Sequence, residues 1–120
     1  MLEGTTAADL LSVEESKQIC RLGKGPVITF MDKGTVYDTA LRSTLIRLAE
    51  ENGIAWQTKQ MIAGGTDASV IQRSREGVRT AILAVAVRNI HSPVSVAHIG
   101  DMEQILALAR LFLNEMAGEA

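Results

Sequence analysis

The apolar stretch TAILAVAV, residues 80–87, constrains the fold of this chain more than any other segment. Every residue after its first threonine is apolar, and its length suits a buried strand better than a helix. A strand with apolar side chains on both faces is typical of a parallel sheet that helices cover on either side. We therefore expect an α/β fold with this strand at its centre.

Two long amphipathic helices are predicted. The first covers residues 37–53, with Asp38 as its N-cap and Gly53 at its end. The second covers residues 100–116, with Asp101 as its N-cap. Apolar residues recur in both at the spacing of one helix face. The predicted buried stripes are Leu41, Leu45, Leu48 and Ala49 in the first helix, and Ile105, Leu108, Ala109, Phe112 and Met116 in the second.

Predicted strands alternate with these helices. Residues 26–31 and 55–62 are short, rich in apolar or β-branched side chains, and bounded by Gly, Pro or charge, and residues 66–77 resemble a shorter helix. The alternation predicts right-handed crossovers and a mostly parallel sheet layered between helices. Residues 1–120 are expected to form a single α/β domain.

Composition excludes several classes of function. The formal net charge is −2 and the basic residues are scattered, so we expect no nucleic-acid partner. No apolar run is long enough to cross a bilayer, and the N-terminus lacks the features of a secretory signal, so we expect a cytoplasmic protein without a membrane partner. The single cysteine, Cys20, is expected to be an inert buried thiol.

Unusual polar clusters follow all three predicted strands. They read DKGT after the first strand, AGGTDAS after the second and RNIHSP after the third. In open α/β sheets, ligands bind outside the carboxyl ends of the strands. The three clusters are therefore the candidate functional site.

His91 stands in the RNIHSP cluster and has two interpretations. Its imidazole suits a metal ligand or a general base, but position alone favours a loop histidine hydrogen-bonded to backbone. Arg88 either binds a carboxylate or peptide group near His91 or is a paired surface charge. The other histidine, His98, precedes the last helix and is expected to be structural.

The GGTDAS cluster, residues 64–69, is also ambiguous. Gly64 and Gly65 precede a helix start, where backbone N–H groups can meet an anion, but they also suit a tight turn with Thr66 as the cap. Asp67 is suited to orient the imidazole of a metal ligand. Asp9 has no evident role from its own surroundings.

Four segments together resemble a known family. EGTTAAD (3–9), RLGKGPVITFMD (21–32), GGTDAS and RNIHSP occur in this order, and an amphipathic helix follows them. They resemble the C-terminal part of the M42 family of metallo-aminopeptidases. That family includes glutamyl and deblocking aminopeptidases and the TET peptidases, and some members carry an endoglucanase label.

The resemblance implies a peptidase with two divalent metal ions, zinc or cobalt, that removes N-terminal residues from peptides. It implies that His91 binds one ion and Asp9 the other. It also implies a homo-oligomer. The residues expected to contact substrate or to support the metal ligands are Gly64, Gly65, Thr66, Asp67 and Arg88.

The family pattern also implies what this chain lacks. A complete member supplies a histidine, a bridging aspartate and a Glu-Glu pair with the general base, all before the EGTTAAD segment. No residue of the chain is therefore predicted as catalytic, and its enzymatic activity is uncertain. We expect the C-terminal portion of a larger catalytic domain, inactive alone. The alternatives are a non-catalytic interaction or assembly module and one half of a split peptidase.

Overall fold

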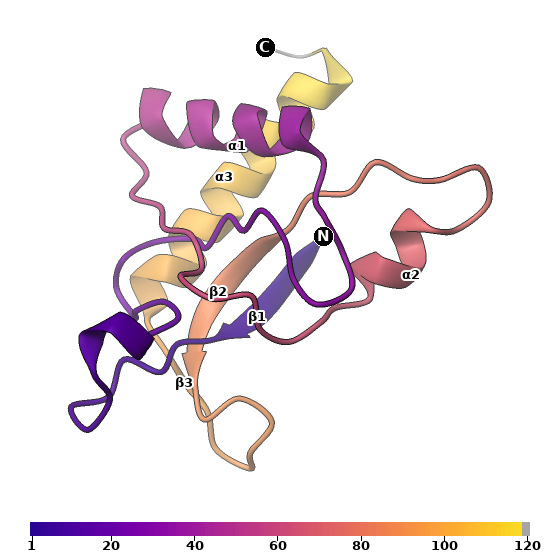
Figure 1. Cartoon of the computed structure of the whole chain (residues 1–120). Coiled ribbons are helices and arrows are strands. Elements are labelled where there is room, and N and C mark those ends of the chain that lie inside the picture. Colours follow the sequence, from indigo (N-terminus) through magenta and orange to yellow (C-terminus); the bar gives the residue numbers. More distant parts are fainter. Residues whose placement is uncertain (119–120) are drawn as a thin grey trace.

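The computed structural model describes residues 1–118, and within them a small sheet is combined with helices (Figure 1). The α/β class predicted from the sequence is confirmed. In chain order the elements are β1 (Leu2–Thr6), a 3-10 helix (Glu15–Lys17), α1 (Thr39–Glu51), α2 (Ala68–Gln72), β2 (Leu83–Arg88), β3 (Val96–Ala97) and α3 (Ile99–Ala117).

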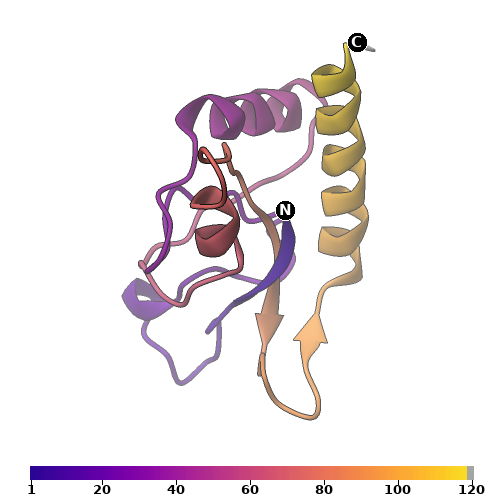
Figure 2. The same ribbon diagram turned by 90° about the vertical axis from the view of Figure 1, so that its right-hand side faces the viewer.

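The sheet is mixed, with β2 between β1 and β3. β1 runs parallel to β2, with Leu2 opposite Leu83, and the two-residue β3 runs antiparallel to it. Figure 2 shows α3 on one side of the sheet and α2 on the other. One parallel pair therefore forms the centre of the fold.

β2 is apolar because both of its faces are covered. Leu83 and Val85 pack into the cluster formed with α1 and α3. Ala84 and Ala86 face the opposite way, into a second cluster that contains Cys20. The large side chains thus face the helices, and the small ones leave room on the other face.

The strands predicted over 26–31 and 55–62 are not formed as such. Val27, Met31 and Gln57 make only isolated bridges there, and Val27 exchanges both backbone hydrogen bonds with Ala84, at 2.8 and 3.0 Å. The chain turns back at residues 32–35, where Asp32 N–H donates to the carbonyl oxygen of Thr35 and Tyr37 N–H donates to that of Phe30. This turn ends the pairing before a strand can extend.

The long helices are confirmed, with one correction at a cap. Asp38 caps α1 by accepting a hydrogen bond from Leu41 N–H at 2.9 Å. His98, and not Asp101, caps α3, because its Nδ1 accepts from Gly100 N–H at 3.2 Å. Asp101 lies inside the first turn and is buried. The expectation that His98 is structural agrees with this position.

The apolar stripes follow the prediction over most of their length. Leu45, Leu48 and Ala49 are buried in α1, and Ile105 and Leu108 in α3. Met116, in contrast, is 52% exposed. The predicted stripe therefore loses its core contacts near the end of α3.

α2 is shorter than the predicted helix over 66–77. It ends at Gln72, whose carbonyl oxygen accepts from Val78 N–H at 3.1 Å. Between them Arg75 has a left-handed φ of 51°. The chain is therefore turned back by Arg75 and the residues around it before a longer helix can form.

Cys20 is buried as predicted, with 3% of its surface exposed. Burial raises the pKa of its thiol to about 12, and its Sγ donates to the carbonyl oxygen of Thr6 at 3.2 Å.

Because the thiolate is the reactive form, we expect the Cys20 thiol of the folded chain to resist an aromatic disulfide reagent near pH 8. Absorbance of the released thiol measures this, with the urea-unfolded chain as the reactive control. Rapid native reaction would contradict the burial.

None of the helices within residues 1–118 combines the length and the apolar character needed to cross a membrane.

Candidate functional site

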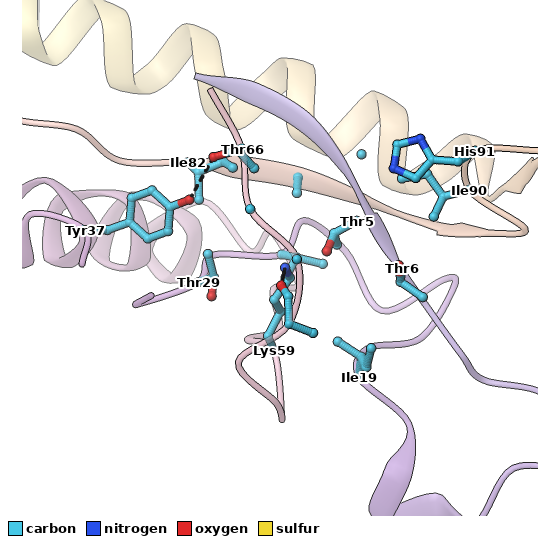
Figure 3. Close-up of a pocket in the computed structure, with 16 residues that line it drawn as sticks. Thr5, Thr6, Ile19, Thr29, Tyr37, Lys59, Thr66, Ile82, Ile90 and His91 are labelled. Carbon is cyan, nitrogen blue, oxygen red and sulfur yellow. Dashed lines mark hydrogen bonds between the residues drawn. The ribbon is translucent and has the colours of Figure 1, made fainter. Parts of the chain in front are cut away.

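A pocket of about 90 Å³ lies against the small-residue face of β1 and β2 (Figure 3). Ala84 is part of its lining, and the side chains of Thr29 and Thr66 face it from two loops. Gly64, Gly65, Thr66 and His91 all line this one pocket. The structure therefore brings together the GGTDAS and RNIHSP clusters, although the strand predicted before GGTDAS is not formed. Asp67, Arg88 and Asp9 are not part of the lining.

His91 is presented by a strained loop at the end of β2. Its φ is 64° and that of Asn89 is 55°, both left-handed. The Ser92 hydroxyl lies 2.7 Å from the carbonyl oxygens of Asn89 and Val94, and the Ser95 hydroxyl donates to the Asn89 oxygen at 3.0 Å. Serine hydroxyls thus hold the loop in a conformation that non-glycine residues rarely adopt. The imidazole is exposed at the rim of the pocket.

Thr66 is held in the pocket wall by a hydrogen-bond network. Its hydroxyl donates to Asp32 Oδ2 at 3.3 Å, lies 3.2 Å from the Tyr37 hydroxyl, and accepts from Ala68 N–H at 3.3 Å. Lys59 Nζ donates to the carbonyl oxygen of Ala63 at 3.1 Å, at the start of the same loop. Side-chain hydrogen bonds therefore support the loop at Ala63 and at Thr66.

Asp32 is the buried anchor of this network, and sequence reasoning did not single it out. Tyr37 hydroxyl donates to its Oδ2 at 2.6 Å and Gly34 N–H to its Oδ1 at 2.8 Å. Burial raises the pKa of Asp32, but these hydrogen bonds outweigh it and the net pKa is lowered. Burial and the Asp32 carboxylate raise the pKa of Tyr37. At neutral pH, Asp32 is ionised and Tyr37 keeps its proton.

The sequence signal for Asp32 was present in the DKGT cluster. The segment from Asp32 to Tyr37 contains a Gly-Thr turn, which brings the tyrosine hydroxyl back onto the carboxylate. The cluster is one of the three that follow predicted strands. The sequence did not indicate that Thr66 is a hydrogen-bond partner of Asp32, because Thr66 lies in another loop.

Asp9 and Arg88 form a bidentate ion pair. Arg88 Nε donates to Asp9 Oδ1 at 2.7 Å and its Nη2 to Oδ2 at 2.8 Å, while Leu22 N–H donates to Oδ2 at 3.0 Å. Both carboxylate oxygens are thus engaged. Arg88 is a paired charge, the second of its two interpretations. Metal binding by Asp9 stays a prediction, and it requires that this pair open.

The ion pair predicts a pH dependence of stability. The hydrogen bond from Arg88, only partly opposed by burial, lowers the pKa of Asp9 below its ordinary 3.8. A lowered pKa stabilises the folded chain above that value, and the contribution is lost as the pH falls through the folded pKa. We expect Arg88→Gln to lower the free energy of unfolding at pH 7 and to have little effect at the lowest pH that the fold tolerates.

Urea denaturation at steps from pH 7 to pH 3 measures the difference. Arg110→Gln, on the exposed side of α3, is the matched control and should show no such pH trend. A difference between wild type and Arg88→Gln that is the same at pH 7 and pH 3 would show that the pair does not stabilise through its charge.

Among residues 1–118, the donor set for a metal is not complete. Within residues 1–118, no group of three or more His, Cys, Asp or Glu side chains is arranged to hold a metal ion. His91 offers one imidazole at the pocket, and structural or catalytic centres use three or more protein ligands. The residues described here therefore do not by themselves fit a dinuclear centre.

Comparison with known proteins gives a consistent result. The family model for M42 glutamyl aminopeptidases matches residues 1–108. The chain is 36% identical over 104 residues to a lysyl aminopeptidase of Pyrococcus furiosus, covering 86% of this chain and 29% of that protein.

Solved structures agree with this match. An aminopeptidase from the archaeon Desulfurococcus kamchatkensis superposes with a TM-score of 0.87 at 33% identity, over 92% of this chain and 32% of that one. A TET peptidase from Pyrococcus horikoshii, which can assemble into a tetrahedron or a large octahedral shell, has a TM-score of 0.67 at 30% identity, over 90% and 31%.

The chain thus spans about 30% of the length of the relatives that it matches. The match covers the pocket, the His91 loop and the Asp32 network together. This chain therefore belongs to the M42 family of glutamyl aminopeptidases.

Proposed function

We propose that this chain is the C-terminal portion of the catalytic domain of a dinuclear-metal aminopeptidase and is inactive alone. The observation that carries the proposal is that His91 and the Gly64–Thr66 loop line one pocket in a member of this family. The absence of a complete donor set within residues 1–118 supports inactivity of the chain by itself.

His91 is proposed to supply one metal ligand, with the remaining ligands and the general base coming from outside these 120 residues. Zinc or cobalt is the proposed metal, because an imidazole and carboxylate donor set suits either. Asp9 is proposed as a ligand only in a state in which Arg88 has released it.

The rest of the pocket is proposed to bind the peptide substrate. Its wall offers the hydroxyls of Thr29 and Thr66 and the ammonium group of Lys59. Backbone groups of Gly64 and Gly65 border the same space. The Asp32 network keeps Thr66 in place, so the wall is ordered before the peptide arrives. A cytoplasmic homo-oligomer is the proposed setting, and the assembly of the Pyrococcus horikoshii peptidase supports the oligomer.

A joined polypeptide tests the proposal. The part of the Pyrococcus furiosus lysyl aminopeptidase that precedes its match to this chain would be fused to residue 1. Metal content and hydrolysis of lysyl and leucyl nitroanilides are then measured for this polypeptide and for the chain alone. We expect metal binding and turnover only in the joined polypeptide, both lost on His91→Ala.

His98→Asn is the matched control, because asparagine also caps a helix and leaves α3 intact. Turnover by the chain alone would contradict its proposed inactivity. A joined polypeptide that binds metal equally well with and without His91 would contradict the ligand assignment.

A further inference from the structure

Lys59 gives the pocket beside His91 a positive lining. It is the only Lys, Arg, Asp or Glu among the described residues that line this space. The Asp32 carboxylate is not part of the lining, and its Oδ2 already accepts hydrogen bonds from Tyr37 and Thr66. Figure 3 shows the Lys59 side chain pointing from its loop toward the middle of the pocket. The lining therefore attracts an anion and repels a cation.

Lys59 has no carboxylate partner among residues 1–118, because none of the ion pairs formed there involves it. Its Nζ donates to the carbonyl oxygen of Ala63 at 3.1 Å, which uses one of the three donors of an ammonium group. The side chain is half-buried, and a cation that leaves water without a paired anion costs free energy. A carboxylate on a ligand would supply the missing partner.

The loop that contains Gly64 and Gly65 offers further donors beside Lys59. The Gly64 carbonyl oxygen is occupied, because it accepts from Lys33 N–H at 2.9 Å. The amide N–H groups of Gly64 and Gly65 have no protein acceptor among residues 1–118. A β-carbon at either glycine would meet nothing within 4 Å, so the space beside both is open. An anion held by Lys59 therefore lies near unused N–H donors.

The rest of the lining suits a short side chain with a charged end. Ile19, Val27 and Ala84 are its apolar parts. The hydroxyls of Thr29 and Thr66 already donate hydrogen bonds within the chain. The volume of about 90 Å³ holds roughly six water-sized groups, which is close to the size of an aspartate or glutamate side chain. The pocket is therefore matched to a carboxylate on a short aliphatic stem.

We propose that Lys59 sets the specificity of this pocket for the first residue of the peptide. Its ammonium group binds the side-chain carboxylate of an N-terminal aspartate or glutamate and repels an N-terminal lysine or arginine. The inference rests on the proposed function, because it takes the bond to be cleaved to lie beside His91. An aminopeptidase cleaves the bond after the first residue, so the side chain that enters the pocket next to His91 is that of the N-terminal residue.

Membership of the family does not decide this preference. The family model is named for glutamyl aminopeptidases, whereas the Pyrococcus furiosus relative is named for lysyl residues. A lysine side chain in this pocket would bring two like charges together in a half-buried space, where their repulsion is less screened than in water. Lys59 therefore distinguishes between the two substrate classes in this chain.

The joined polypeptide provides the kinetic test. The ratio kcat/KM is measured for aspartyl, glutamyl, leucyl and lysyl nitroanilides, with the leucyl substrate as the neutral reference. These substrates have no C-terminal carboxylate, so a preference for the acidic ones arises from the side chain of the first residue. We expect the better acidic substrate to exceed the lysyl substrate at least about tenfold.

Substitutions of Lys59 separate its charge from its structural contact with Ala63. Lys59→Met should lower the preference for acidic over leucyl substrates about tenfold or more. Lys59→Arg should retain most of that preference, and Lys59→Glu should raise the lysyl substrate relative to the leucyl one about tenfold or more. A purely structural lysine would give losses that are equal for all four substrates.

Lys24→Met is the matched control, because it removes an exposed lysine that does not line this pocket. It should leave the order of the substrates unchanged. The inference is overturned if the wild-type joined polypeptide prefers the lysyl substrate, or if Lys59→Met changes the preference no more than Lys24→Met does.

Binding to the chain alone separates this inference from the proposed function. Nuclear magnetic resonance follows the amides of Gly64 and Gly65 while glutamyl or lysyl nitroanilide is added, and the glutamyl compound should bind at least about fivefold more tightly. Tighter glutamyl binding beside an inactive joined polypeptide would support the role of Lys59 and refute the function. Turnover that depends on His91, without a preference for acidic substrates, would support the function and refute the role of Lys59.

Discussion

Gly25→Ala is expected to destabilise the chain by roughly 3 kcal/mol or more. A β-carbon at Gly25 would lie 2.0 Å from the carbonyl oxygen of Ala55 and 3.0 Å from Gln104 Oε1. The first contact is with backbone, which cannot swing away as a side-chain end can. The residue also has a φ of 81°, where any side chain adds strain. Urea denaturation followed by the fluorescence of Trp56 measures the loss.

Gly53→Ala is the matched control for this substitution. Gly53 has a φ of 64°, but a β-carbon there would meet nothing within 4 Å. Only the backbone strain remains, which costs about 1 kcal/mol. Equal losses for the two variants would show that the contact between Gly25 and Ala55 does not determine the effect.

Asp101→Ala is the second large effect we expect, again about 3 kcal/mol or more. The carboxylate is buried and accepts from Gly23 N–H at 2.8 Å and Gly25 N–H at 2.9 Å. Alanine removes both acceptors and leaves two backbone donors unpaired at the base of α3. Thermal unfolding monitored by circular dichroism measures the change.

Two further variants test whether the loss of stability comes from the lost hydrogen bonds of the Asp101 carboxylate. Asp101→Asn keeps the shape and one acceptor oxygen, so its loss should be intermediate. Glu103→Gln, two residues along on the exposed side of α3, should change stability little. Asp101→Ala with a loss no larger than that of Glu103→Gln would show that the link between α3 and the Gly23–Gly25 turn is not a major source of stability.

The centre of the fold and the two long helices could be predicted because their signals are local. The apolar run of β2 and the cap at Asp38 are each read from a few consecutive residues. The meeting of His91 with the Gly64–Thr66 loop was also expected, although the strand predicted before that loop is not formed.

The features that could not be predicted depend on contacts between segments that are distant in the sequence. β1 contains glycine and glutamate and has little strand character, and it forms because β2 supplies its partner. The bidentate ion pair between Arg88 and Asp9 joins residues that are 79 positions apart. Asp101 was predicted as a cap because it precedes an apolar stripe, but its carboxylate serves a turn more than 70 residues away. Local pattern cannot reveal such partners.

The connection from β2 to α3 has a consequence for how the pocket is assembled. Only six residues separate His91 from His98, the cap of α3, and within them β3 adds to the sheet. The helix is in turn fastened to the Gly23–Gly25 turn through Asp101. The position of the His91 loop is therefore tied to the packing of α3 through a connection of only six residues.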